Sequence, residues 1–339
     1  ASDTVTITAF FTEAMTATPR ISISGLVTNV VMTKISIGGN SSVVTQLGAD
    51  IDGQRTNDDN GRSVSLSSDG LTVAIGSPEW ENTGTIPNRF SEGKVAIYRW
   101  NGSAWTQLGS NIRGEARDNY SGYSLSLSSN GTRVAIGAYG NDGNGANSGH
   151  VRIYDYNGSA WVQVGADIDG EADSDGSGKS LSLSSDGSRV AIGAMNNDGN
   201  GSNSGHVRIY DYNGSAWVQV GGDIDGEAAG DQSGSSVSLS SDGSRVVIGA
   251  RLNDAGNASS DNRGHVRIYD YNGSAWVQVG ADIDGEGAGD ASGFSVSISS
   301  DGTRIAVGAP SNNDAASDAG HVRVYSLPGE VYKYTWDVD

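Results

Sequence analysis

Short runs of alternating apolar and polar residues recur along the chain and predict β-strands. In one clear copy, four such runs cover Ser180–Ser184, Arg189–Gly193, His206–Tyr210 and Ala216–Val220. A period of two and many β-branched residues are typical of strands that bury one face. Asp-Gly separates the first two runs and Asn-Gly the last two, and both dipeptides readily adopt the positive φ angles of tight hairpin turns. The pattern predicts a four-stranded antiparallel unit, and no segment has the periodicity of an amphipathic helix.

The same unit occurs five times. Its marker, Gln followed by Val or Leu and then Gly, recurs every 56 to 61 residues, at Gln46, Gln107, Gln163, Gln219 and Gln278. Repeats of this length are typical of propeller blades rather than of helical solenoids. The fifth unit lacks a fourth strand, and Ser42–Gly48 near the N-terminus matches it. We therefore predict an all-β fold, a five-bladed β-propeller over residues 38–329, in which this N-terminal strand completes the last blade and removes a free edge.

The repeat resembles the FG-GAP family, whose repeats build integrin-type propellers and many bacterial surface proteins. Gly293-Phe294 and Gly308-Ala309-Pro310 match the two motifs that give the family its name, and Gly122-Tyr123 is a looser copy. The resemblance covers about residues 41 to 328 and implies the propeller fold and a role in adhesion. The chain departs from the integrin pattern between strands one and two, where Ser-Ser-Asp-Gly replaces a loop of spaced acids. This departure argues against calcium bound in the integrin manner.

The two ends of the chain break the repeat. Arg20–Ser24 and Val331–Val338 read as alternating strands, and residues 1–37 and 330–339 resemble pieces of bacterial Ig-like surface domains. Because closure of the propeller brings residues near 38 and 330 together, we expect the propeller to be inserted into a partial Ig-like β-sandwich. Free edges of this half sandwich can pair with a neighbouring subunit or with further Ig-like domains.

Charge excludes several classes of partner. The chain has 40 acidic and 21 basic residues, a net charge of −19, which repels nucleic acids and anionic membrane surfaces. No apolar run approaches the ~20 residues that span a bilayer, so we expect no membrane insertion. The chain has no cysteine, so cysteine content gives no indication of an oxidising or a reducing compartment. The composition and the resemblance together predict an extracellular protein, secreted or attached to the cell surface.

The acidic loops between blades are candidate Ca²⁺ sites. Spaced carboxylates around a glycine turn supply the oxygen ligands that Ca²⁺ takes in flexible loops. The alternative is that Asp-Gly makes the turn and the other acids are solvated. The second unit has Asn111 and Arg113 at corresponding positions, where a guanidinium opposes a cation. The candidate metal ligands are Asp167, Asp169, Glu171, Asp175, Asp223, Asp225, Glu227, Asp231, Asp282, Asp284, Glu286 and Asp290.

Histidine and tryptophan each recur at one position of the repeat. We interpret the histidines as structural, because ring symmetry places equivalent residues far apart: His150, His206, His265 and His321. The tryptophans of the fourth strand are expected to pack between blades rather than to stack on sugars: Trp105, Trp161, Trp217 and Trp276. The Asn-Gly-Ser triplets match the N-glycosylation pattern, but hairpin turns explain them better.

A specific ligand requires a feature that the repeats do not share. The first unit has an unusual loop with two aromatic and two acidic residues, and the second unit adds Tyr120. Aromatic faces stack on sugars and acids bind hydroxyl groups, so this loop can contact a glycan or a protein. The alternative is that the loop packs on its own hydrophobic cluster. The candidate ligand-binding residues are Trp80, Glu79, Glu81, Arg89, Phe90 and Tyr120.

The inner strands argue against catalysis. Each reads Ser-(Val/Leu)-Ser-(Leu/Ile)-Ser, which lines the channel with hydroxyls and provides no differentiated pair of acids. No nucleophile or phosphate-binding motif is present either. We therefore predict a non-catalytic extracellular adhesion or ligand-binding module of a bacterial surface protein, which binds a glycan or protein through its variable-loop face. A structural spacer or assembly subunit of a surface filament is the alternative, and a glycan-active propeller enzyme is the more remote one.

Overall fold

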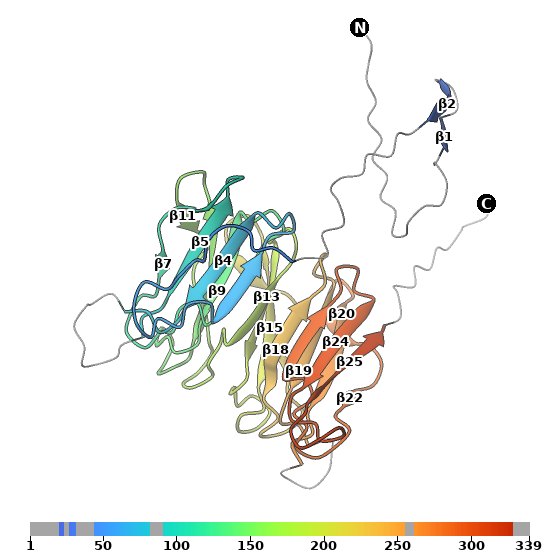
Figure 1. Ribbon diagram of the computed structural model, residues 1–339. Helices are drawn as coiled ribbons and strands as arrows, with labels where there is room; N and C mark the ends of the chain where they lie inside the picture. Colours follow the sequence, from blue (N-terminus) through green and yellow to red (C-terminus); the bar gives the residue numbers. More distant parts are fainter. Residues whose placement is uncertain (1–19, 24–26, 32–43, 82–90, 255–260, 328–339) are drawn as a thin grey trace, which may run out of the picture. The chain divides into compact units, whose positions relative to one another are not determined.

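The computed structural model describes residues 20–23, 27–31, 44–81, 91–254 and 261–327 (Figure 1). The chain forms two units, Ala1–Leu47 and Gly48–Asp339. In the first unit β1 (Arg20–Ile23) pairs antiparallel with β2 (Val27–Val31), which confirms the strand expected near Arg20. The other flanking strands lie outside the described residues, so the Ig-like sandwich stays a prediction.

Five antiparallel sheets of similar build follow one another along the second unit, and we call them blades 1 to 5 (Figure 1). Blade 1 consists of β3 (Ser63–Leu66), β4 (Thr72–Ser77), β5 (Lys94–Trp100), β6 (Trp105–Gln107) and β7 (Ile112–Arg113). Blade 2 consists of β8 (Ser124–Leu127), β9 (Arg133–Ala138), β10 (His150–Tyr156), β11 (Trp161–Gln163) and β12 (Ile168–Asp169). In both, the first four strands pair in sequence order, and the short fifth strand pairs back on the third.

The later blades repeat this order. Blade 3 consists of β13 (Ser180–Leu183), β14 (Arg189–Ala194), β15 (His206–Tyr212), β16 (Trp217–Gln219) and β17 (Ile224–Asp225). Blade 4 consists of β18 (Ser233–Leu239), β19 (Arg245–Ala250), β20 (His265–Tyr271), β21 (Trp276–Gln278) and β22 (Ile283–Asp284). Blade 5 consists of β23 (Ser295–Ile298), β24 (Arg304–Ala309) and β25 (His321–Ser326). The chain is therefore an all-β protein of the β-propeller type, as the repeat predicts.

Apolar side chains of consecutive blades form shared cores. One core joins Ala74, Val95 and Ile97 of blade 1 to Leu125 and Ile136 of blade 2, all nearly or fully buried. Burying a side chain of this kind stabilises the fold by about 1.5–3 kcal/mol. Because each core draws on two blades, every blade depends on its neighbour for stability, as is typical of repeat proteins.

Three of the four fourth-strand tryptophans connect neighbouring blades, which confirms the role predicted for them. The Nε1–H group of Trp161 donates to the carbonyl of Leu108 in the preceding blade at 2.7 Å. Trp217 and Trp276 make the same hydrogen bond, each to a carbonyl of the blade before it at 2.9 Å. The Asn-Gly-Ser triplets form turns, since the side-chain oxygen of Asn157 accepts from the backbone N–H groups of Ser159 and Ala160 at 3.0 Å.

The predicted closing strand is not formed in the described residues. Val44–Leu47 have no strand conformation, and blade 5 ends at β25. Val322 and Val324 of β25 are 68% and 67% exposed, whereas their equivalents in blade 4 are almost fully buried.

Candidate functional site

Among the described residues, four blades carry a group of one histidine and two acids, and we call these groups the His–acid clusters. The aspartate follows the histidine in blades 2 to 4, whereas in blade 5 it is Asp314, which precedes the histidine. In each cluster the candidate ligand atoms lie within 4.8 Å of one another. The clusters are Glu115, His150 and Asp167; Glu171, His206 and Asp223; Glu227, His265 and Asp282; and Glu286, His321 and Asp314.

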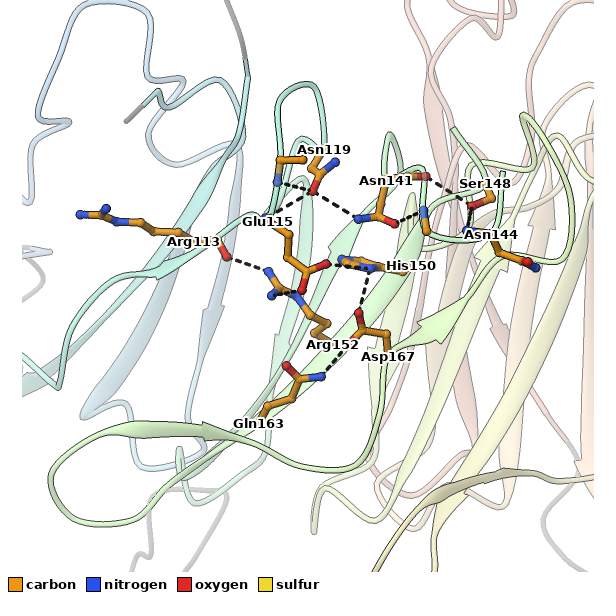
Figure 2. Close-up of polar contacts among 12 residues, drawn as sticks. Arg113, Glu115, Asn119, Asn141, Asn144, Ser148, His150, Arg152, Gln163 and Asp167 are labelled. Carbon is orange, nitrogen blue, oxygen red and sulfur yellow. Dashed lines mark hydrogen bonds and ion pairs between the residues drawn. The ribbon is translucent and has the colours of Figure 1, made fainter. Parts of the chain in front are cut away.

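Three segments build the cluster of blade 2. Glu115 follows β7 in the connection from blade 1, His150 begins β10, and Asp167 precedes β12 (Figure 2). The Nδ1 atom of His150 lies 3.5 Å from Oδ2 of Asp167 and 3.9 Å from Oε2 of Glu115. Since β12 pairs with the start of β10, the exit of the fourth strand brings Asp167 beside the histidine. The cluster thus ties the connection between two blades to the sheet of the second.

A second layer of contacts orients the two carboxylates (Figure 2). Oε1 of Glu115, the oxygen that faces away from His150, lies 3.3 Å from Nη1 of Arg152. The other terminal nitrogen of Arg152, Nη2, donates to the carbonyl of Arg113 at 2.7 Å. The outer oxygen of Asp167, Oδ1, accepts from the side-chain amide of Gln163 at 2.5 Å. Each carboxylate therefore turns its other oxygen toward His150.

Burial keeps His150 and His206 neutral. The side chain of His150 is 1% exposed, and burial, followed by the nearby Arg152 charge, lowers its pKa to about 4. The pKa of His206 is lowered to about 4 for the same reasons, with Arg208 as the nearby charge. Burial also raises the pKa of Glu171 above its ordinary value. A neutral imidazole is the form that binds metal ions.

The acids of one inter-blade loop do not form one site. Asp167 belongs to the cluster of blade 2, and Glu171, four residues later, belongs to that of blade 3. Asp175 is instead buried, and its Oδ2 accepts from the backbone N–H groups of Glu171 and Ala172 at 3.2 and 3.0 Å. The cluster members from the predicted set are Asp167, Glu171, Asp223, Glu227, Asp282 and Glu286.

The other predicted acids have other contacts. Asp231 and Asp290 accept backbone N–H groups as Asp175 does, at 3.0 and 2.8 Å. The remaining three lie in the short fifth strands, where their backbone carbonyls accept hydrogen bonds from arginines of the next blade: Asp169, Asp225 and Asp284.

Sequence reasoning missed the histidines and Glu115 as members of a common group. A signal was available, because each of the first three histidines is followed 17 residues later by an aspartate, at Asp167, Asp223 and Asp282. The spacing alone does not show that the side chains meet, since that depends on the pairing of the third and fifth strands.

Trp80 is buried, so its predicted role as an exposed stacking surface is wrong. Its side chain is 3% exposed, and three cations face its ring at 4.9 to 5.7 Å from the centroid: Arg55, Lys94 and Arg113. Cations held over an indole ring are attracted to its negative face. Glu79 accepts from Ser91 Oγ at 2.7 Å, and the backbone carbonyl of Glu81 accepts from Arg55. Arg89 and Phe90 lie outside the described residues.

A group of three tyrosines, Tyr120, Tyr123 and Tyr139, distinguishes blade 2 from the other blades, and we call it the tyrosine patch. Tyr120 stacks on Tyr139 with centroids 5.0 Å apart, and Tyr123 meets Tyr139 edge-on at 4.7 Å. Lys179 lies over Tyr139 at 5.0 Å, and Arg62 donates to the hydroxyl of Tyr123 at 2.7 Å. The three rings are half-buried, and burial, with Tyr120 and Tyr123 next, raises the pKa of Tyr139 to about 12.

The fold and these repeated groups define a β-propeller repeat protein with polar clusters between its blades. The chain is similar in structure to a Bacteroides uniformis protein described as a 6-phosphogluconolactonase, with 14% identity, a TM-score of 0.51, and coverage of 78% of this chain and 80% of that one. It is also similar to a periplasmic gluconolactonase of Pseudomonas aeruginosa, with 15% identity, a TM-score of 0.46, and coverage of 79% and 71%. At such identities the likeness shows the fold alone.

Comparison of sequences adds no family. No family model matches the chain, and no curated protein matches it in sequence. In the part of the chain that the structure describes, no helix is long and apolar enough to cross a membrane.

Proposed function

We propose that this chain is a non-catalytic, extracellular adhesion or ligand-binding module of a bacterial surface protein, and that it binds a glycan or protein through the tyrosine patch. The patch carries the proposal because it is a cluster of three half-buried aromatic rings that the other described blades do not share. At the position of Tyr139 the later blades have Met195, Arg251 and Pro310. The resemblance of the repeats to FG-GAP propellers supports the same role.

The chemistry of the patch favours an acidic ligand. Arg62 and Lys179 flank the tyrosine rings in a protein whose net charge is −19. Tyrosine offers a large apolar face with a hydroxyl at its edge, which suits a sugar ring, and the two cations suit its carboxylates. An acidic polysaccharide is therefore the ligand class that we propose.

The serines of the inner strands are engaged in contacts between blades, which supports a non-catalytic role. The hydroxyl of Ser124 donates to the carbonyl of Gly178 at 2.7 Å, and Ser180 donates to Gly234 in the same way. Ser182 Oγ accepts from the backbone N–H of Leu239 at 3.0 Å. Nucleophilic catalysis by serine requires a general base beside the hydroxyl. These three hydroxyls instead make hydrogen bonds to the backbone of the neighbouring blade.

Binding to polysaccharides tests the proposal. Alginate, which is carboxylated, is expected to bind and neutral dextran is not, as measured by biolayer interferometry. The variant with Tyr120→Gly, Tyr123→Ser and Tyr139→Met copies residues that blades 3 and 4 carry at these positions, so it is expected to fold. It should bind at least about tenfold more weakly, a loss of about 1.4 kcal/mol.

The matched control is Asp142→Asn, on an exposed loop outside the patch, which should bind as the original protein does. Equal binding by the triple variant and the control would contradict the role of the patch. A separate assay addresses catalysis: hydrolysis of glucono-δ-lactone should proceed at the uncatalysed rate, and a rate proportional to protein concentration would contradict a non-catalytic role.

A further inference from the structure

Blade 1 replaces all three members of the His–acid cluster together. Gln54 stands at the glutamate position, Lys94 at the histidine position and Asn111 at the aspartate position. The structure supports this correspondence. Lys94 begins β5 as His150 begins β10, and Gln107 donates to Asn111 at 2.7 Å as Gln163 does to Asp167. The three positions thus behave as one unit.

The replacement puts a fixed cation into the cluster. The side chain of Lys94 is 2% exposed, and its ammonium nitrogen lies 2.9 Å from Oε1 of Gln54 and 3.9 Å from Oδ2 of Asp58. In blade 1, where Lys94 brings a positive charge into the cluster, the amides Gln54 and Asn111 occupy both acid positions. Buried charges are paired or coordinate metals, because an isolated one is costly to desolvate. In the other blades the glutamate of each cluster pairs with an arginine through one oxygen, which leaves its second oxygen and the aspartate beside the histidine as the groups that a further cation would meet.

The cluster of blade 2 shows a buried nitrogen directed at these groups. Nδ1 of His150 has no hydrogen-bond partner, although its side chain is 1% exposed and two carboxylate oxygens lie 3.5 and 3.9 Å away. Buried polar atoms of native proteins nearly always have a partner. In the other three clusters Nδ1 also faces a glutamate oxygen, at 3.5 to 3.8 Å, although the buried nitrogen without a partner there is Nε2. We propose that each His–acid cluster binds one divalent transition-metal ion of the Zn²⁺ type, through Nδ1 of the imidazole and one oxygen of each acid.

The distances fit tetrahedral coordination. Bonds of 2.0–2.2 Å at tetrahedral angles place neighbouring ligand atoms about 3.4 Å apart. To reach this spacing, Nδ1 of His150 must approach Oδ2 of Asp167 by about 0.1 Å and Oε2 of Glu115 by about 0.5 Å, and the ligand atoms of the three residues already lie within 4.8 Å of one another. Three protein ligands leave a fourth position for water. Arg152 and Gln163 hold the outer carboxylate oxygens, as second-layer groups do at metal sites.

The histidine changes the expected metal. Ca²⁺ takes six to eight oxygen ligands, whereas imidazole with carboxylates suits Zn²⁺ and other transition metals. The calcium prediction of the sequence rested on oxygens alone. The clusters of blades 2 to 4 have histidines that are 1% exposed, whereas His321 of blade 5 is 22% exposed, so we expect three tight sites and one weaker site.

Isothermal titration with Zn²⁺, after removal of metal by chelator, tests the proposal. The unchanged protein should take up at least three Zn²⁺ ions per chain, and thermal unfolding should shift to a higher temperature with saturating Zn²⁺. Co²⁺ should give the visible absorption bands of a four-coordinate site. Ca²⁺ should give no comparable shift.

Variants that convert one blade into another sharpen the test. Glu171→Gln with Asp223→Asn copies the amides of blade 1 into blade 3 and should lower the Zn²⁺ stoichiometry by one. Asp198→Asn, on an exposed loop of the same blade, is the matched control and should leave it unchanged. Gln54→Glu, Lys94→His and Asn111→Asp together should add one site to blade 1.

Circular dichroism establishes that each variant is folded before it is titrated. Failure of the unchanged protein to bind Zn²⁺ in physiological salt would overturn the proposal. An unchanged Zn²⁺ stoichiometry in the variant Glu171→Gln with Asp223→Asn would also overturn the proposal. Tighter binding of Ca²⁺ than of Zn²⁺ by the unchanged protein would do the same. Because the tyrosine patch is not part of any cluster, the polysaccharide assay and the Zn²⁺ titration succeed or fail independently.

Discussion

Single glycines permit the close approach of neighbouring blades. A Cβ atom on Gly193 would lie 2.2 Å from the carbonyl oxygen of Gly234 in the next blade, and the glycines at this position in blades 1, 2 and 4 face the same obstacle. Real side chains do not tolerate such a distance, so the backbone would have to move. In blade 5 the obstacle near Gly308 is the movable hydroxyl of Ser295, at 2.5 Å. The stability lost when alanine replaces this glycine should therefore differ between blades.

We expect Gly193→Ala to lower the free energy of unfolding by about 3 kcal/mol or more, because two backbones must separate. Gly308→Ala should cost less, and Gly222→Ala, with nothing within 4 Å of its added Cβ, should change stability by at most about 0.5 kcal/mol. Urea unfolding measures all three. Equal losses for the first two variants would show that the backbone contact is not what limits the position.

In blades 2 to 5 the third strand is the element that organises the His–acid cluster. Residues two apart on a strand share a face, so His206 and Arg208 on β15 both reach Glu171, at 3.8 and 3.5 Å. The apolar residues between and after them, Val207 and Ile209, are buried on the opposite face. One strand thus serves the core and the cluster at once.

Low pH should destabilise the metal-free protein through the buried histidines of the third strands. The pKa of His206 is about 4 in the folded state and about 6.5 when unfolded. The unfolded chain therefore binds more protons between these values, so the stabilising effect of neutral histidine is present above pH 6.5 and lost as the pH falls toward 4. At about pH 4, each of His150 and His206 lowers the free energy of unfolding by about 3 kcal/mol relative to neutral pH. Glu171 offsets part of this loss, because its raised pKa changes the free energy of unfolding in the opposite direction.

Urea unfolding in the presence of chelator, from about pH 7.5 to about pH 4.5, measures this slope. His206→Gln removes one of the titrating groups and should reduce the slope, while Asp198→Asn should keep it. An acid slope that His206→Gln leaves unchanged would assign the effect to other groups.

The whole molecule combines a repeated scaffold with a strong excess of negative charge. Forty acidic residues face 21 basic ones, and many of the basic groups are already paired within blades, as Arg189 is with Asp211 at 2.6 Å. A large net charge keeps a protein soluble but destabilises the compact state by self-repulsion.

Screening of this charge should stabilise the protein. Between about 10 mM and about 300 mM NaCl the Debye length falls from about 30 Å to below 10 Å. We expect the unfolding temperature to rise by on the order of 3 °C, as followed by calorimetry at neutral pH with chelator present. A fall in this temperature would mean that attractive ion pairs outweigh the repulsion.

The amino-acid sequence by itself determined the strands, the turns, the number of blades and the role of Trp161, Trp217 and Trp276, because each follows from a local pattern that the repeat copies. The tertiary structure alone decided which side chains meet. It divided Asp167 and Glu171 between two clusters and joined each to a histidine, because strand pairing brings together residues that are far apart in the chain. It also buried Trp80 among cations, since this burial depends on packing between segments and not on the pattern within one.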